Sequence, residues 1–184
     1  MLGGDDELIV LGTDDSSELD GGAGRNLLDL GAGADTVTAD LEAGTATVTY
    51  KGVTEIYSFV RFEDTRAQAY GPVNVTGTDG SNLIQVYGCN VEVTAGAGED
   101  VVRWRELSAL GVVGKLPDFR ATSLSAATCG DPGIESRFNG EEGDDRLYSG
   151  SGDDDLTGGA GNDTADGNRG QDHCEAETVT DCES

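Results

Sequence analysis

The feature that most constrains this chain is a nine-residue repeat near its C-terminal end. From Gly140 the sequence divides into four consecutive blocks: GEEGDDRLY, SGSGDDDLT, GGAGNDTAD and GNRGQDHCE. In every block the fourth residue is glycine, the sixth is aspartate, and the eighth is small or apolar. Such strict self-similarity predicts a stack of short turns, in which each unit buries its apolar residue against its neighbours.

The repeated residue types suit a divalent cation. Glycine lets a chain turn sharply and leaves carbonyl oxygens directed into the turn. Calcium takes about six to eight oxygen ligands and mixes carboxylates with carbonyls. We therefore predict Ca²⁺ at the sixth-position aspartates and the turn glycines: Asp145, Asp154, Asp163, Asp172, Gly143, Gly150, Gly152, Gly159, Gly161 and Gly170.

The number of blocks in one coil decides which aspartates meet. If two blocks form a coil, Asp145 stacks with Asp163, and Asp154 stacks with Asp172. Each pair would hold an ion between adjacent coils. Without the ion the carboxylates repel one another, so we expect calcium binding to contribute directly to folding.

Weaker copies of the repeat occur upstream. One starts at Gly21 and carries Asn26 where aspartate is expected, and two others end in Asp35-Thr36-Val37 and Asp100-Val101-Val102. Asp35 and Asp100 are therefore further candidate calcium ligands. For Asn26 and Asn82 we expect a structural role in backbone hydrogen bonding.

The rest of the chain predicts β-structure. Residues 45–50 and 91–94 alternate with period two, and no segment has a helical apolar stripe. We expect an all-β chain in three segments: degenerate repeats over 1–102, an irregular loop or insertion over 103–139, and calcium-binding coils over 140–184. These segments are expected to form one continuous solenoid.

The charge of the chain excludes several partners. With 36 acidic and 11 basic residues the net charge is −25, which repels nucleic acid and anionic membranes. No apolar run approaches the roughly 20 residues that span a bilayer. The content of hydrophobic residues, 36%, argues against disorder and for a foldable chain completed by a cation. The first residues lack the features of a signal peptide, so we expect a mature fragment or a module of a larger protein.

The four cysteines are Cys89, Cys129, Cys174 and Cys182. An even number without a CxxC pair favours disulfides and an oxidising, extracytoplasmic setting. Three connectivities are possible. We favour Cys89–Cys129 and Cys174–Cys182, because each closes the shorter loop.

On the tandem blocks, the chain resembles the RTX-type (haemolysin-like) calcium-binding nonapeptide-repeat family. Its ending, residues 170–183, is similar to that of extracellular actinobacterial calcium-binding repeat proteins, in which a cysteine pair closes the last coil; this supports Cys174–Cys182. The resemblance implies a right-handed parallel β-roll, Ca²⁺ held by aspartates and turn carbonyls, secretion to the cell exterior or surface, and a structural or accessory role. The chain departs from the family at Asn26, Glu141 and Asn168.

Enzymatic activity is not expected. The single histidine, His173, lies inside the last repeat, and the neighbouring carboxylates are explained by solvation or calcium. Trp104, between two arginines, could be a ligand platform, but we favour a role in covering the core. The function we favour is a calcium-stabilised accessory module, possible partners being copies of itself or a larger parent protein. The alternatives are a self-assembling surface or filament component, and a flat-face binder of ice or glycans through Thr45, Thr47 and Thr49.

Overall fold

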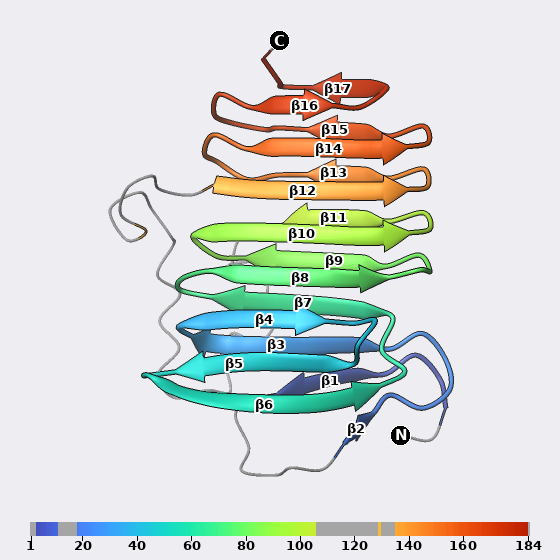
Figure 1. Ribbon diagram of the computed structural model, residues 1–184, viewed down its shortest axis with the longest axis vertical. Helices are drawn as coiled ribbons and strands as arrows, with labels where there is room; N and C mark the ends of the chain where they lie inside the picture. The colour runs from blue at the N-terminus through green and yellow to red at the C-terminus, as the bar shows by residue number, and fades with distance from the viewer. Residues whose placement is uncertain (1–2, 11–17, 106–128, 130–134, 184) are drawn as a thin grey trace.

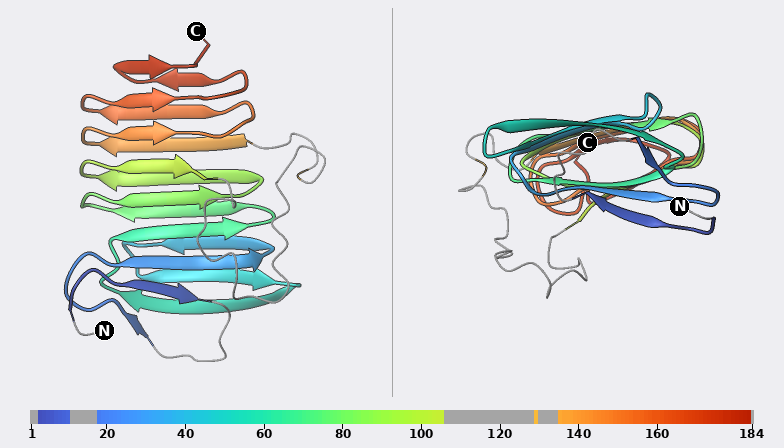
Figure 2. Two further views of the ribbon diagram at one scale, coloured as in Figure 1. Left: turned by 180° about the vertical axis from the view of Figure 1, so that it is seen from behind. Right: turned by 90° about the horizontal axis from the view of Figure 1, so that it is seen from below.

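The computed structural model describes residues 3–10, 18–105, 129 and 135–183. The described strands form two sheets that face each other along the length of the molecule (Figures 1 and 2). The eight-stranded sheet contains, in spatial order, β1 (Glu7–Val10), β3 (Leu27–Ala34), β7 (Asp64–Ala69), β9 (Leu83–Tyr87), β11 (Val101–Trp104), β13 (Arg146–Tyr148), β15 (Thr164–Asp166) and β17 (Thr178–Thr180). The nine-stranded sheet contains β16 (His173–Glu175), β14 (Asp155–Ala160), β12 (Glu135–Glu142), β10 (Asn90–Ala97), β8 (Val73–Thr78), β4 (Thr36–Asp40), β5 (Thr45–Tyr50), β6 (Val53–Val60) and β2 (Leu19–Asp20).

From β7 onward the chain alternates between the two sheets, so every second strand pairs in parallel. In the repeat region the paired residues are 18 positions apart: Arg137 pairs with Asp155, and Arg146 with Thr164. Two nine-residue blocks therefore make one coil, which is the condition under which Asp145 stacks with Asp163 and Asp154 with Asp172. The all-β prediction is confirmed, and the arrangement is consistent with a β-roll.

The core is a thin layer between the sheets. Eighth-position side chains from successive coils stack on one another, and the larger ones, such as Leu147 and Leu156, are completely buried. The largest fully buried side chain is Phe138 in β12. Stacking thus replaces the bulky aromatic core that this glycine-rich sequence lacks.

The parallel prediction is wrong between Thr36 and Val60. There β5 runs antiparallel to both β4 and β6, because the chain reverses in two hairpins, while β4 itself still pairs in parallel with β8. Tyr50 pairs with Val53, so Lys51 and Gly52 alone form the second turn, and both have positive φ angles (49° and 77°). This backbone matches a tight two-residue hairpin. The strand predicted over 45–50 is present as β5.

The hairpins bring the threonines of β5 onto one outward face with those of β4. Thr47 pairs with Thr38 and Ile56, and Thr49 pairs with Thr36 and Thr54. Of the three threonines predicted to form a flat face, Thr45 is exposed, whereas Thr47 and Thr49 are half-buried.

Both predicted disulfides are present. Cys89 is bonded to Cys129 and Cys174 to Cys182, with Cα–Cα distances of 5.2 and 5.9 Å. The segment predicted as irregular, residues 103–139, includes the last residues of β11 and the first residues of β12. Between these strands the structure describes only Arg105 and Cys129, so most of the predicted segment lies outside the described residues. Trp104 packs against the core and lies 5.4 Å from Tyr87 between ring centroids, as expected for a residue that covers its edge. In the part of the chain described, no helix is long and apolar enough to cross a bilayer.

Candidate calcium-binding turns

The strand register aligns the sixth-position residues of successive coils in two columns. The first column follows the eight-stranded sheet, and its members lie two residues before the aligned core positions: Asp6, Asn26, Glu63, Asn82, Asp100, Asp145, Asp163 and Glu177. The second follows the nine-stranded sheet and contains Ser136, Asp154 and Asp172. The four aspartates of the tandem blocks are therefore brought together in pairs, as the two-block coil predicted.

From Asp100 onward, one carboxylate oxygen of each column aspartate ties two coils together. In the first column Oδ1 of Asp163 accepts a hydrogen bond from the backbone N–H of Asp145 (2.9 Å). Oδ1 of Asp145 accepts one from Asp100 (2.8 Å), and Oδ1 of Asp100 accepts one from Asn82 (2.7 Å). These three bonds link four successive coils, from Asp163 back to Asn82.

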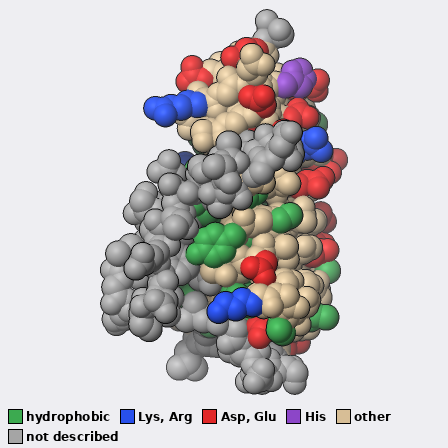
Figure 3. All heavy atoms as spheres, turned by 90° about the vertical axis from the view of Figure 1, so that its left-hand side faces the viewer, with side chains coloured by type: hydrophobic (Ala, Val, Ile, Leu, Met, Phe, Trp, Pro, Cys, Tyr) green, Lys and Arg blue, Asp and Glu red, His purple; other side chains and the backbone are tan. Residues whose placement is uncertain are grey.

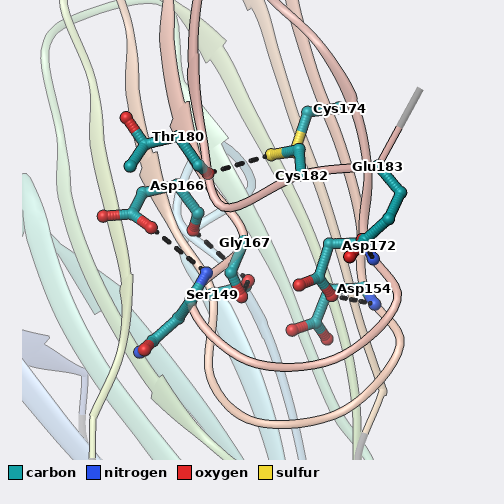
Figure 4. The surroundings of a disulfide bond; sticks show 10 residues. Ser149, Asp154, Asp166, Gly167, Asp172, Cys174, Thr180, Cys182 and Glu183 are labelled. Carbon is teal, nitrogen blue, oxygen red and sulfur yellow. Dashed lines mark hydrogen bonds between the residues drawn. A yellow bond between two sulfur atoms is a disulfide. The ribbon is translucent and has the colours of Figure 1, made fainter.

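The second column repeats the same contact. Oδ1 of Asp154 accepts from the N–H of Ser136 (2.6 Å), and Oδ1 of Asp172 accepts from the N–H of Asp154 (2.9 Å; Figure 4). Asp35 lies in neither column. Its carboxylate is exposed and accepts from the N–H of Gly52 in the hairpin turn (3.1 Å), so the structure does not group it with the other candidates.

The second carboxylate oxygen of four column aspartates takes no part in these contacts. Oδ2 of Asp100, Asp145, Asp154 and Asp163 is buried and has no hydrogen-bond partner among the described residues. A buried carboxylate oxygen without a partner is costly, because nothing replaces the water it has lost. A bound cation would remove that cost, and Ca²⁺ prefers oxygen ligands of this kind. The donor set therefore fits calcium.

First-position glycines make room beside these oxygens. A Cβ added to Gly140, Gly158 or Gly167 would lie 2.7 Å or less from Oδ2 of the aspartate in the same block. The prediction from the sequence omitted these three glycines, although their spacing of five residues before each aspartate was visible in the blocks.

The predicted glycines have several roles. The fourth-position glycines stack on one another between coils: a Cβ on Gly143 would lie 1.6 Å from the carbonyl oxygen of Gly98, and one on Gly170 equally close to that of Gly152. A Cβ on Gly161 would meet the carbonyl oxygen of Gly143, and one on Gly159 that of Glu141. Gly150 instead lies against the Trp104 ring. Glu141 and Asn168 replace the expected second-position glycine and still take positive φ angles (76° and 67°), so the turn conformation is kept.

In the N-terminal part of the first column, asparagine amides and an arginine make the contacts between coils. Asn26 accepts from the N–H of Asp6 (3.2 Å) and donates to the carbonyl of Arg61 (3.0 Å). Arg25 binds both carboxylate oxygens of Asp64 at 2.8 and 2.7 Å. Asn82 accepts from the N–H of Thr78 (2.7 Å). Both asparagines thus bond to the backbone, as expected, and the polar groups of these coils are paired with one another.

Burial changes the acidity of the column aspartates. It raises the pKa of Asp100 to about 6; the N–H of Asn82 opposes this shift, and the neighbouring Asp145 carboxylate adds to it. Burial also raises the pKa of Asp145, Asp154 and Asp172. The charged form is therefore disfavoured in the folded, calcium-free protein.

We expect the calcium-free protein to become more stable as the pH falls from 7 to 5. A raised pKa in the folded state means that the favourable contribution of Asp100 is complete below its unfolded pKa and is lost as the pH rises through about 6. Asp100→Asn should stabilise the calcium-free protein at pH 7 by roughly 2 kcal/mol and flatten this dependence. Urea unfolding in chelator at several pH values measures both effects. Equal pH profiles for the two proteins would contradict the assignment.

The described residues contain no group of three or more His, Cys, Asp or Glu side chains able to hold a metal ion. Any ion in the columns would therefore take most of its ligands from turn carbonyls. His173 is exposed and lies 3.5 Å from Glu175.

A comparison with protein-family models matches the RTX calcium-binding nonapeptide repeat (4 copies) to residues 2–37, 11–45 and 138–174. The matched ranges include the four tandem aspartates, Asn26 and Asp35, and leave out Asp100. A search of curated proteins found no match.

Proposed function

Because this chain belongs to the RTX calcium-binding nonapeptide-repeat family, we propose that it is a secreted structural or accessory module, a right-handed β-roll that folds on binding calcium. The observation that carries the proposal is the set of four buried Oδ2 atoms, all in the two columns, that have no hydrogen-bond partner within the part of the chain that the structure describes. Four carboxylates in this state oppose folding unless a cation joins them. Calcium is thus expected to be a structural part of the module.

Two features support an extracellular location. The protein has two disulfides and no free cysteine in the described part of the chain, and disulfides persist in oxidising compartments. Acidic side chains also gather along the edge of the molecule and around its C-terminal coils (Figure 3). Such a surface suits a calcium-rich exterior and disfavours nucleic acid as a partner. We propose no catalytic role, since the single histidine is explained by its exposed turn.

A calcium titration followed by far-UV circular dichroism tests the proposal. We expect the β signal to grow with Ca²⁺, to reverse with a chelator, and to respond much more weakly to Mg²⁺, which requires a more regular octahedral site. Asp154→Asn combined with Asp163→Asn should reduce the response, because each substitution removes the charge of one buried carboxylate.

The matched control combines Asp155→Asn with Glu142→Gln. Both residues are exposed and the change in charge is the same, so the calcium response should stay at the wild-type level. A wild-type spectrum that does not change up to millimolar calcium would contradict the proposal. Particle size measured with and without calcium separates an accessory module from a self-assembling filament, for which size would grow with concentration.

A further inference from the structure

Both columns end on a glutamate that belongs to none of the nonapeptide blocks. Oε2 of Glu177 accepts a hydrogen bond from the N–H of Asp163 (2.8 Å), at the end of the first column. Oε2 of Glu183 accepts one from the N–H of Asp172 (2.5 Å), at the end of the second (Figure 4). Inside the columns, the N–H of a sixth-position residue is bound by the aspartate of the next coil. The two glutamates take over that position where no further coil follows in the described chain.

The backbone repeats the regular pattern around Glu177, whereas Glu183 pairs with His173 and lies one position past the column. The N–H of Thr178 donates to the carbonyl of Asp163 (3.0 Å), just as the N–H of Thr164 donates to that of Asp145 (2.8 Å). The N–H of Glu183 donates to the carbonyl of Asp172 (2.7 Å), so Glu183 binds that residue through both its backbone and its side chain. One more set of hydrogen bonds between coils therefore forms at the end of each column.

The spacing explains why glutamate is used. Regular column partners are 18 residues apart, but Glu177 follows Asp163 by 14 residues and Glu183 follows Asp172 by 11. The shorter turn before Glu177 still returns β17 to the regular register with β15, whereas Glu183 returns one position past the column. The extra methylene of glutamate gives its carboxylate a longer reach than that of aspartate.

The last aspartate of the first column has the same need as the internal ones. Asp163 is 1% exposed, and its Oδ2 has no partner among the described residues, although its own N–H is bound by Glu177. In the second column the last aspartate, Asp172, is 2% exposed. In an internal pair, the next coil supplies a second carboxylate beside the buried one. At the end of each column a glutamate carboxylate takes that place, on the N–H that an aspartate of the next coil would otherwise bind.

We propose that Glu177 and Glu183 are calcium ligands that complete the last cation site of each column, Glu177 with Asp163 and Glu183 with Asp172. This inference rests on the proposed function, because it assigns ligands to the same kind of site. One oxygen of each glutamate accepts a hydrogen bond from a backbone N–H, which places the carboxylate beside the last aspartate of its column. The two residues also end both columns with a charge that the bound ions neutralise.

The disulfide Cys174–Cys182 positions these residues. Cys174 follows Asp172 by two residues, and Cys182 directly precedes Glu183, so the bond ties the second column to its terminal glutamate (Figure 4). Glu177 lies within the loop that the same bond closes. The bond thus restricts the freedom that a chain end would otherwise have, and it lowers the entropy lost when the sites fill.

Glutamine substitutions test the inference on the full chain. Glu177→Gln and Glu183→Gln keep an oxygen that can accept the backbone hydrogen bond, but they remove the charge that binds a cation. In calorimetric titration with calcium chloride, each single variant is expected to weaken one site by about tenfold or more, since calcium affinity follows the charge of the ligands. The double variant should weaken two sites. Glu175→Gln is the matched control, because Glu175 lies on the same coil, is exposed, and belongs to neither column.

The outcomes separate this inference from the proposed function. If the wild-type protein binds calcium and the glutamine variants bind it with unchanged stoichiometry and affinity, the assignment of Glu177 and Glu183 is overturned while the proposed function stands. If the wild-type protein binds no calcium, the proposed function fails first. Should the double variant not fold in calcium, the two single variants decide the question, since each is expected to lose only one site.

Discussion

Replacing Gly143 by alanine is expected to destabilise the calcium-bound protein by about 3 kcal/mol or more, the upper range for overpacking. Gly143 has a φ angle of 135°, and a Cβ there would lie 1.6 Å from the carbonyl oxygen of Gly98 in the preceding coil. The obstacle is backbone, which cannot rotate away as a side chain can. Moving the coils apart would also break the hydrogen bonds from the N–H of Gly98 to Glu142 (2.8 Å) and from the N–H of Gly143 to Ala160 (2.9 Å).

Gly80→Ala is the matched control for this substitution. Gly80 also precedes a column residue by two positions, but an added Cβ would meet only Thr78 Oγ1 at 3.8 Å, which is an ordinary contact. Denaturant unfolding of both variants in millimolar calcium makes the comparison. Equal stability of the two variants would show that the coils are not stacked as closely as the structure places them.

Removing calcium is expected to open residues 135–183 while β3, β7 and β9 keep most of their protection. In the C-terminal coils the columns contain aspartates whose second oxygens have no partner, among them Asp145, Asp154 and Asp163. Toward the N-terminus the corresponding positions are bonded internally by Asn26, Asn82 and the pair Arg25–Asp64. A site that is filled at about a thousand times its dissociation constant contributes about 4 kcal/mol. The free energy lost with several such sites exceeds the folding stability that a thin group of coils has by itself.

Hydrogen exchange measured with calcium and with chelator locates this effect. We expect the peptides that contain β12 to β17 to exchange fast in chelator, and those that contain β3, β7 and β9 to exchange at nearly the same slow rate in both conditions. The variant that combines Asp154→Asn with Asp163→Asn is the control for the role of the carboxylates. In this variant the difference in exchange rate between calcium and chelator should be smaller. A uniform loss of protection along the whole chain would contradict the division into calcium-dependent and calcium-independent coils.

The pairing of Asp145 with Asp163 and of Asp154 with Asp172 could be predicted because it depends on period alone. Four blocks of nine residues without insertion leave one register if two blocks form a coil. Asp100 was predicted as a candidate on its own motif, and the structure joins it to Asp145 across 45 residues. Asp35 carried an equally good motif, but the register of β4 with β8 aligns Val37, and not Asp35, with the second column. A local motif cannot show the register in which its strand will pair, and this is why the two candidates differ.

The sequence by itself determined the all-β class and the nine-residue spacing of the sixth-position aspartates, and it favoured the two disulfides that form, since these follow from residue types at regular or countable spacings. Only the tertiary structure decided that two blocks make one coil, that Glu63 and Glu177 share positions with those aspartates, and that Glu183 reaches the end of the second column. Their turns differ in length from the repeat, being 37, 14 and 11 residues from their partners. Where coil lengths vary, the alignment is set by backbone pairing between strands and by the buried layer beneath them, and both depend on contacts between residues far apart in the chain.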